Sequence, residues 1–485
     1  MKSANVVAVD VGTSSVKAAL YDQRARCVAE VRHPYRPRLS ADGTAEVEAD
    51  ALEHLVAGSL TQVLRAAGPT RADTIVGVGV STFWHGLLAA DDSARPLTPV
   101  YLWADTRSAS DSQTLRGRMD AEAVRQRTGC PIHASYWPAK LAWLRKERPD
   151  LWRRPVRWLS LGDLLFWRMF GRLSTSLSMA SGTGLFLLKE RQWDGELLTA
   201  LRVSQRSLPP VADEEFERGL LARHRRRWPA LGDVPWLLAM GDGALANFGS
   251  GCLTPTRRSL TVGTSGALRV MHAAADAPLP QGLWRYRLDA DRMVTGGALS
   301  SGGNLRDWLL ATLRLGKGQL ERQLRTMAPA AHGLTFLPHL AGERSPGYAA
   351  HAFGAVAGLT TSSTAEQIAR AGLEAVAIEF AGINRRLDQV APRPAHLVAS
   401  GMALLSSPAW MQMMADAIGR PVAAAKAGEA SMRGAALYVL SRLGLADPSK
   451  LDPGVGRTFV PRAAARKALR LAQERQESLY RALIG

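Results

Sequence analysis

The sequence predicts an α/β protein of two domains. Its 485 residues, 46% of them hydrophobic, exceed one ordinary core and suit two domains of about 200–250 residues each. Each half contains two apolar segments joined by a glycine-threonine-serine turn, VDVGTSSVK at 9–17 and LTVGTSGAL at 260–268. Further glycine-rich segments at 295–304 and 397–410 follow an apolar strand and precede a helical pattern. Such successive strand-to-helix turns are typical of an α/β fold.

The composition argues against several other classes of protein. The three cysteines, Cys27, Cys130 and Cys252, form no C-x-x-C pair, which is typical of a protein in a reducing compartment. With neither a signal-peptide pattern nor a run of about 18 apolar residues, we expect a cytoplasmic protein without a membrane partner. The net charge of +18 is spread along the chain without a nucleic-acid-binding motif, so we expect no specific nucleic-acid partner. A homodimer is compatible with the sequence.

An acidic residue interrupts the first apolar strand. Asp10 lies within VVAVDV at 6–11, where an unpaired buried carboxylate would cost several kcal/mol, so it requires a partner or a function. When the two hairpins are aligned, Asp10 falls opposite Thr261. The glycine and hydroxyl residues of both turns offer free backbone N–H groups to phosphates. One carboxylate facing two phosphate-binding turns is what a Mg²⁺ ion bound to a nucleotide would need, and Asp10 is the candidate metal ligand.

A second acidic residue ends another apolar strand. Asp242 lies between two glycines in WLLAMGDGALANFGSG at 236–251. An aspartate at such a position commonly caps the following helix. The flanking glycines, however, would leave its carboxylate uncovered and allow a ligand to approach closely. From the residues alone, capping and catalysis are equally supported.

Aromatic and polar residues follow two further strands, the first of which covers 75–80. The side chains of Trp84, His85, Trp103, Asp105 and Arg107 would form a wall suited to a polyhydroxylated ligand. In such a wall the rings pack on C–H groups and the polar ends bond hydroxyl groups. The alternative is that both tryptophans belong simply to the core.

These motifs, in this order, resemble the FGGY family of carbohydrate kinases over almost the whole chain. The segments that carry the resemblance are DVGTSS at 10–15, STFWH at 81–85, WADTRS at 103–108, GDGALANFGSG at 241–251, TVGTSGALR at 261–269, LPHLAGERSPGY at 337–348 and EASMRGAAL at 429–437. The resemblance implies two actin-like or ribonuclease-H-like domains with an active-site cleft between them. The expected boundaries are 1–247 for the sugar-binding domain and 248–485 for the nucleotide-binding domain.

The resemblance also implies ATP and Mg²⁺ as cofactors and a role for each matching residue. Asp242 matches the general base and Asp10 the acid that helps to hold Mg²⁺. The expected nucleotide contacts are Gly12, Thr13, Ser14, Lys17, Gly263, Thr264, Gly303, Gly401 and Ser406, and the expected sugar contacts are Trp84, His85, Trp103, Asp105, Arg107 and Asp242. For Lys17 a second interpretation, a solvated strand residue, remains open.

Within the family the chain resembles the gluconokinases most closely, which implies phosphorylation of D-gluconate to 6-phosphogluconate. The carboxylate of such a substrate would require a cation, and Arg107 and Lys140 are candidates. Two departures fall on the sugar side, Trp84-His85-Gly86 in place of Met-His-Ser and TGCPIHASYWPAK at 128–140. A third is Gly401-Met402 in place of a Gly-Gly pair, at the nucleotide. The alternatives are a kinase for another sugar such as xylulose, and a non-catalytic actin-like nucleotide sensor, although the sensor predicts loss of the second acid.

Three helices are predicted in the C-terminal half. Ser363-Thr364-Ala365-Glu366 reads as a capping box that opens a helix through about Leu387, which packs in the core or helps to close the lobes. Ser407 is the expected N-cap of a helix that stops at Gly419. The segment 465–484 is expected to be amphipathic, with Leu469, Ala472, Leu479 and Leu483 on its packed face.

Overall fold

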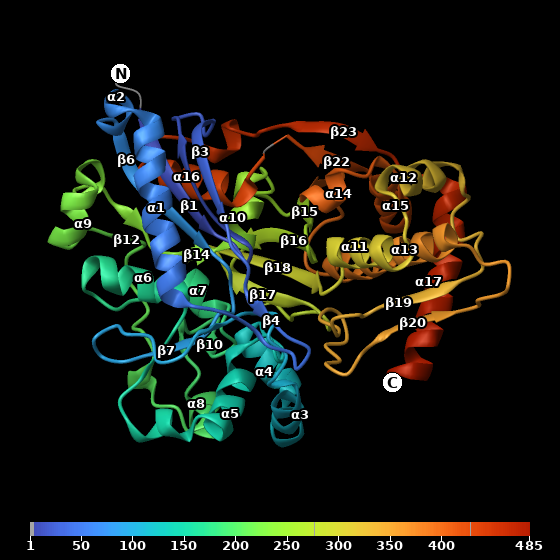
Figure 1. The fold of residues 1–485 in the computed structure, drawn as a ribbon, viewed down its shortest axis with the longest axis horizontal. Helices are drawn as coiled ribbons and strands as arrows, with labels where there is room; N and C mark the ends of the chain where they lie inside the picture. Colours follow the sequence, from blue (N-terminus) through green and yellow to red (C-terminus); the bar gives the residue numbers. More distant parts are fainter. Residues whose placement is uncertain (1–3, 276, 427) are drawn as a thin grey trace.

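Two seven-stranded sheets form the centre of the structure, one in each half of the chain (Figure 1). The computed structural model describes residues 4–275, 277–426 and 428–485. The first sheet has the order β12-β13-β6-β1-β2-β3, with β14 paired to β6. Its strands are β1 (Asn5–Val11), β2 (Ser15–Tyr21), β3 (Cys27–Pro34), β6 (Ile75–Thr82), β12 (Phe216–Glu217), β13 (Trp236–Leu237) and β14 (Met240–Gly241). All seven residues of β1 are buried, because packing covers both faces of this strand.

The second sheet repeats the topology of the first. Its order is β17-β18-β16-β15-β21-β22-β23, from β15 (Arg257–Val262), β16 (Gly266–Ala273), β17 (Trp284–Arg287), β18 (Arg292–Leu299), β21 (His396–Ser400), β22 (Val422–Ala425) and β23 (Val455–Phe459). In both sheets a strand pairs antiparallel with the next strand of a meander and parallel with a later strand: β1 with β2 and β6, β15 with β16 and β21. The predicted duplication into two actin-like, ribonuclease-H-like α/β units is therefore confirmed.

The remaining elements surround these sheets. The short strands are β4 (Arg38–Leu39), β5 (Ala45–Val47), β7 (Leu88–Ala90), β8 (Val100–Tyr101), β9 (Arg157–Leu159), β10 (Phe186–Leu187), β11 (Gln192–Trp193), β19 (Thr335–Pro338) and β20 (Gly354–Ala357). The helices of the first half are α1 (Ala49–Ala67), α2 (Pro69–Ala72), α3 (Ala109–Arg118), α4 (Ala121–Thr128), α5 (Trp137–Glu147), α6 (Leu161–Phe170), α7 (Leu177–Ser181), α8 (Gly195–Leu201), α9 (Ala222–Arg227) and α10 (Asp242–Gly249). Those of the second half are α11 (Gly303–Thr312), α12 (Lys317–Thr326), α13 (Ala365–Leu387), α14 (Met402–Leu405), α15 (Pro408–Ile418), α16 (Ala430–Arg442) and α17 (Ala463–Leu483).

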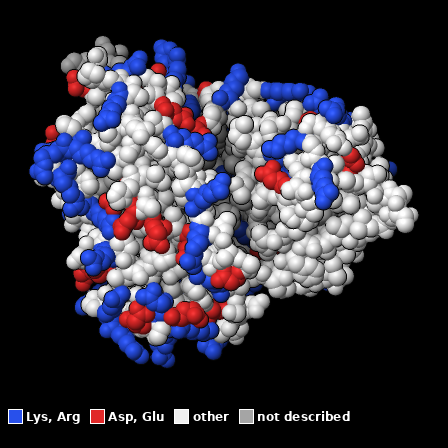
Figure 2. Space-filling view, in the orientation of Figure 1, with Lys and Arg blue, Asp and Glu red and all other residues white. Residues whose placement is uncertain are grey.

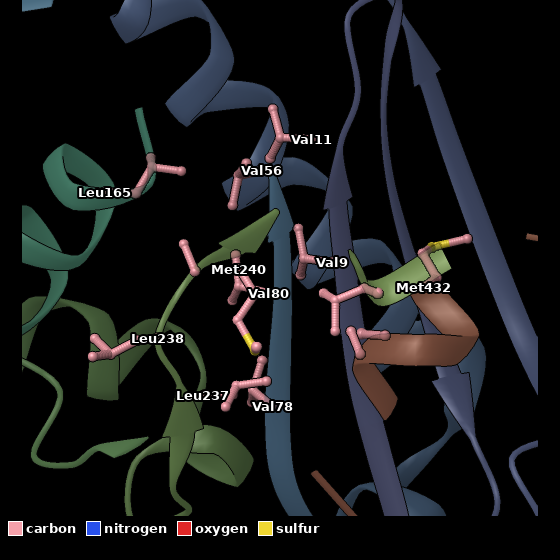
Figure 3. Close-up of a cluster of buried hydrophobic side chains, with 14 of the residues drawn as sticks. Val9, Val11, Val56, Val78, Val80, Leu165, Leu237, Leu238, Met240 and Met432 are labelled. Carbon is pink, nitrogen blue, oxygen red and sulfur yellow. The ribbon is translucent and has the colours of Figure 1, made fainter. Parts of the chain in front are cut away.

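Helix α16 returns from the second half of the chain to the core of the first. Its Met432 lies in the same buried cluster as Val9 of β1 and Val80 of β6 (Figure 3). In Figure 1 this helix accordingly lies beside the N-terminal strands. The domain boundary at residue 247 stays a prediction. The hydrophobic core of the first half also includes residues of α16, from the second half of the chain.

Glycines allow α10 and α16 to pack backbone against backbone. A Cβ atom on Gly434 of α16 would overlap the carbonyl oxygen of Leu245 in α10. A Cβ atom on Gly249 of α10 would likewise overlap the carbonyl oxygen of Ala430. Because α10 begins at Asp242, this contact also fixes the direction from which the Asp242 carboxyl group leaves the helix.

The predicted helices are present, with two corrections. Helix α13 runs to Leu387 as expected, but its capping box uses Thr364 and Gln367 rather than Ser363 and Glu366, because the side chain of Thr364 accepts the N–H of Gln367. In α17, Leu469 and Ala472 are buried as expected, whereas Leu483 is 45% exposed. The last turn of α17 extends beyond the packed part of the helix, so Leu483 stays exposed. Gln476, two turns earlier, is buried.

Helix α15 follows its prediction closely. The side chain of Ser407 accepts the N–H of Trp410, Pro408 occupies the first turn, and Gly419 ends the helix in the left-handed conformation.

Charged side chains are scattered over the face drawn in Figure 2, where Lys and Arg lie among Asp and Glu. Of the three free cysteines, Cys130 and Cys252 are buried and Cys27 is exposed. None of the helices in the described part of the chain combines the length and apolar composition that a membrane span needs.

We predict that Gly434→Ala destabilises the protein by about 1–3 kcal/mol or more, because the new methyl group must displace the backbone of α10. The matched control is Gly58→Ala within α1, where no atom lies within 4 Å of the added Cβ. That control should gain about 0.5–1 kcal/mol, because alanine loses less backbone entropy than glycine. Calorimetric unfolding of both variants tests this, and equal stability of Gly434→Ala and the wild type would contradict the contact.

Candidate active site

A cavity of about 260 Å³ lies where the two sheets approach each other. Both hairpin turns contribute to it, through Thr13 of the first and Gly263-Thr264-Ser265 of the second. Its full lining is Thr13, Phe83, Trp84, His85, Trp103, Asp242, Gly243, Thr261, Gly263, Thr264, Ser265, Gly266, Ala267, Arg269, Trp284, Tyr286, Ala298 and Arg344. The structure thus brings together the predicted base, both predicted phosphate turns and three predicted sugar contacts, Trp84, His85 and Trp103.

Asp242 presents its carboxyl group to this cavity from the first turn of α10. One carboxyl oxygen accepts the N–H of Gly243 at 2.6 Å, and helix α10 is capped by Gly241 rather than by Asp242. Burial and the negative charge of Asp10 raise the pKa of Asp242 to about 6, while the nearby cation of Arg269 acts in the opposite direction. A carboxyl group with such a pKa is largely ionised at neutral pH and is a stronger base than an ordinary aspartate.

The glycines beside Asp242 make room for a ring of the protein itself. A Cβ atom on Gly241 or Gly243 would collide with the indole of Trp84. Both glycines therefore make room for Trp84, whose Nε1 donates to the carbonyl oxygen of Ser178 at 3.0 Å. Asp242 and Gly243 also line the cavity, so the approach of a ligand to this carboxyl group stays a prediction. The ring of Trp84 is packed against the backbone that carries the Asp242 carboxylate.

Aromatic rings form one wall of the cavity. Trp284 and Tyr286 of β17 stack with centroids 4.3 Å apart, and Trp84 meets the edge of this pair at 4.8 Å from Tyr286. Trp84 is 5% exposed, so it serves both the core and the wall. The fixed rings offer apolar faces for the C–H groups of a carbohydrate.

His85 contributes a hydrogen-bond acceptor to the same wall. Its backbone has a φ of +68°, unusual for a residue with a side chain, and its Nδ1 lies 2.5 Å from the carbonyl oxygen of Gly182. Burial holds the pKa of His85 well below its usual value, so the ring is neutral. Because the carbonyl can only accept, Nδ1 carries the proton and Nε2 is left as an acceptor for a hydroxyl group.

Asp10 has the partners that the sequence demanded. The hydroxyl of Ser81 donates to one carboxyl oxygen at 2.7 Å, and the ammonium of Lys17 lies 3.8 Å from the other. Lys17 also pairs with Glu429, just before α16, at 2.5 Å. Lys17 is therefore not a solvated strand residue, because two carboxylates hold its ammonium group, and its contact with a phosphate stays a prediction.

The turn of the first hairpin is one residue longer than that of the second, and this length decides which residue pairs with Asp10. In the first, Val11 pairs with Val16, whereas in the second Val262 pairs with Gly266. The residue across from Asp10 is consequently Lys17, while Ala267 lies across from Thr261. Thr261 instead bonds Ser400 at 3.0 Å.

The donor set around Asp10 fits a Mg²⁺ ion. Within the described ranges no group of three or more His, Cys, Asp or Glu side chains could hold a metal. Mg²⁺ commonly takes only one or two protein carboxylates and fills its other positions with water and phosphate oxygens. Asp10, which lies beside the first turn but is not part of the cavity lining, would supply that carboxylate.

Backbones of three glycine-rich turns converge beside the second hairpin. The N–H of Gly303, at the start of α11, donates to the carbonyl oxygen of Gly263 at 2.8 Å. Gly401 has a φ of +89°, and a Cβ atom there would overlap the backbone of Val262. Met402 is 76% exposed, so the replacement of a family glycine at that position leaves this packing unaffected.

The other predicted nucleotide contacts lie on the turn of the first hairpin and close to Gly401. Gly12 donates its N–H to Ser15 at 3.0 Å, and Ser14 accepts the N–H of Tyr35 at 3.0 Å, which holds the first turn. Ser406 accepts from Arg306 at 3.1 Å, close to the Gly401 turn. No atom lies within 4 Å of a Cβ built on Gly263, so that turn is open to a ligand.

The predicted sugar contacts Asp105 and Arg107, and the candidate cation Lys140, do not line the cavity. Arg107 is bound to Asp105 at 2.6 Å and to Glu46 at 2.7 Å, with its guanidinium over the ring of Trp143. Lys140 is buried and donates to the carbonyl oxygens of His85 and Ser135. The expectation that Arg107 or Lys140 meets a substrate carboxylate is corrected, because internal partners occupy both cations.

The structure instead places Arg269 and Arg344 on the cavity wall, and the sequence reasoning did not select either as a site residue. Both lie inside segments that carry the family resemblance, TVGTSGALR and LPHLAGERSPGY. Their position inside these segments was the signal that could have identified both arginines as site residues. Trp284 and Tyr286 were also missed, because nothing local distinguishes them from core residues of a strand.

The fold and this site define a two-lobed kinase of small molecules, with a carboxyl group in a cavity that both hairpin turns line. The model of the FGGY family of carbohydrate kinases, N-terminal domain, matches residues 5–249, and the model of its C-terminal domain matches residues 259–441. The chain belongs to the FGGY family of carbohydrate kinases, and it is an ATP-dependent carbohydrate kinase.

Similar proteins in this family differ in their named substrates. A gluconokinase of Bacillus subtilis is 27% identical over 463 residues, 92% of this chain and 88% of that protein. The structures of a gluconate kinase and of a xylulose kinase from Lactobacillus acidophilus both align with a TM-score of 0.89 at 26% identity, over 99% or more of this chain and 98% or more of theirs. Glycerol kinases are also among the similar proteins.

We predict that the Asp242 carboxyl group titrates near pH 6 in the ligand-free protein. Asp10→Asn should lower this pKa, since it removes a negative charge that disfavours the ionised form, and Arg269→Gln should raise it. Carboxyl ¹³C NMR of aspartate-labelled protein measures the titration, with Asp242→Asn identifying the signal. A value near 4 in the wild type would contradict the cavity environment described here.

Proposed function

We propose that this kinase transfers the γ-phosphoryl group of ATP to D-gluconate, giving 6-phosphogluconate and ADP. The observation that carries the proposal is the position of Asp242, whose carboxyl group shares one cavity with both hairpin turns and a wall of aromatic rings. The similarity to gluconokinases supports gluconate as the acceptor. The two arginines of the cavity also favour an acidic sugar over a neutral one.

The proton of the attacking hydroxyl group passes to Asp242. As the hydroxyl oxygen bonds to the γ-phosphorus, the bond from phosphorus to the bridging oxygen of ADP breaks. The raised pKa of Asp242 matches this role as base, for which help of about 10²–10⁴-fold is typical. Arg269 would balance charge on the transferring group, because its guanidinium lies between Gly243 and Thr261.

The turns and the rings position the two substrates. The backbone of the hairpin turns that contain Thr13 and Thr264 would hold the phosphates, and Asp10 would hold Mg²⁺, which supplies positive charge against them. The Nε2 atom of His85 would accept a sugar hydroxyl, while Trp84 and Tyr286 would exclude water from the reacting atoms.

Xylulose is the second candidate acceptor, because a xylulose kinase structure aligns as well as the gluconate kinase structure. Coupled measurement of ADP release over sugar acids, ketoses and polyols distinguishes the two. Turnover of D-xylulose without turnover of D-gluconate would overturn the gluconate assignment.

We predict that Asp242→Asn lowers kcat by at least 100-fold and leaves ATP affinity within about twofold. The amide preserves shape and can still accept the N–H of Gly243, but it cannot take the hydroxyl proton. Steady-state kinetics and nucleotide titration measure the two quantities. A variant that keeps more than about a tenth of the wild-type kcat would exclude Asp242 as the base; loss of nucleotide affinity instead would indicate a structural role.

For Asp10→Asn we predict a different signature, in which the Mg²⁺ concentration needed for half-maximal activity rises together with the loss of rate. The amide is a weaker ligand for Mg²⁺ than the carboxylate. A Mg²⁺ titration at fixed ATP measures the requirement, with Asp242→Asn as the matched control whose metal requirement should not move. An unchanged requirement in Asp10→Asn would contradict its assignment as a metal ligand.

A further inference from the structure

Two guanidinium groups reach the cavity, and they lie in different parts of it. Arg269, on β16, is buried, and its guanidinium lies 3.4 Å from the hydroxyl of Thr261 in the second hairpin. Arg344 stacks over the ring of Trp103, 4.8 Å from its centroid. Arg269 therefore lies beside the phosphate turn, and Arg344 beside the aromatic residues predicted to meet the sugar.

Within the described part of the chain, no carboxylate lies within ion-pair distance of Arg344. This distinguishes it from Arg107, which two carboxylates neutralise. Two buried histidines, His85 and His133, lie near Arg344. Burial lowers the pKa of both, and the positive charge of Arg344 lowers it further. The sugar side of the cavity thus carries a half-buried cation that forms no ion pair among the described residues, although its charge helps to lower the pKa of Asp242 across the cavity.

The backbone that carries Arg344 is anchored on both sides. Glu343 accepts the N–H groups of Gly347 and Ala349 and the hydroxyl of Tyr480 on α17, at 3.0, 3.2 and 2.7 Å. Ser345 is anchored to Ala298 of β18, since its N–H donates to the carbonyl oxygen at 2.9 Å and its hydroxyl accepts the N–H at 3.0 Å.

Helix α3 of the first half also reaches this turn. Arg116 donates to the carbonyl oxygen of Tyr348 at 2.8 Å and to that of Ile132 at 2.7 Å. The side chain of Arg344 is therefore presented from a rigid turn rather than from a mobile loop. Preorganisation of this kind reduces the entropy lost when a guanidinium binds an anion.

We propose that Arg344 binds the carboxylate of a sugar acid and makes the enzyme selective for anionic over neutral acceptors. This inference rests on the proposed function. A planar guanidinium fixed over an indole ring can donate two parallel N–H bonds to a carboxylate, which a neutral hydroxymethyl end cannot match. Once the carboxylate is paired at Arg344, the aromatic wall directs the far hydroxyl end of the chain toward Asp242.

The test compares D-gluconate with D-glucitol, which has the same carbon chain and a hydroxymethyl group in place of the carboxylate. We expect Arg344→Gln to lower kcat/KM for gluconate by about 10- to 100-fold, the range of a charge-assisted hydrogen bond. For glucitol, measured as substrate or as competitive inhibitor of gluconate, the change should stay below about threefold. Arg344→Lys keeps the charge without the planar fork and should fall between Arg344→Gln and the wild type.

Arg393→Gln is the charge-matched control, because the Arg393 side chain is 72% exposed and lies outside the cavity lining. It should leave both constants unchanged. Equal losses for gluconate and glucitol in Arg344→Gln, or no loss for gluconate, would overturn the pairing while leaving the proposed phosphorylation of gluconate intact. A wild type that phosphorylates only neutral sugars would instead overturn the proposed function, and with it the need for a carboxylate partner.

Discussion

The contact between α10 and α16 is the constraint on which the site depends most. Glycines at 249 and 434 allow the two backbones to touch, and no larger residue fits at either position. The start of α10 carries Asp242, and the residues at the start of α16 include Ser431, whose hydroxyl donates to the Asp242 carbonyl oxygen at 3.3 Å. One helix crossing therefore joins a late segment of the chain to the first sheet and sets the direction of the Asp242 carboxyl group.

The contact between α10 and α16 also brings a second acidic residue, in addition to Asp10, to the first hairpin. Glu429, just before α16, shares the ammonium group of Lys17 with Asp10. Burial, together with the negative charge of Glu429, raises the pKa of Asp10, so Lys17 and Ser81 offset only part of the cost of the buried carboxylate. The negative charge of Asp10 in turn raises the pKa of Asp242, so the metal-binding candidate and the base are electrostatically coupled.

Duplication supplied two similar sheets, and small differences gave them separate roles. The first hairpin has one more residue in its turn and carries an acid-lysine pair, whereas the second carries hydroxyl groups, Thr261 with Ser400. Positive charge at the cavity comes from the second half, with Arg269 on the phosphate side and Arg344 on the sugar side. The Asp242 carboxyl group from the first half therefore shares one cavity with guanidinium groups from the second.

The sequence by itself determined the local elements and singled out Asp10 and Asp242 as candidate acids. Strand and turn patterns located both hairpins, Ser407 and Gly419 marked the ends of α15, and Asp242 followed a strand at the start of a helix. Such features depend on neighbours a few residues away, so they are legible without a fold. Only the tertiary structure decided that Trp84 fills the space beside Gly241, that internal partners occupy Arg107, and that Arg344 reaches the cavity. Those outcomes depend on side chains more than a hundred residues apart or on competition for one charge, and no local pattern records which partner lies nearest in space.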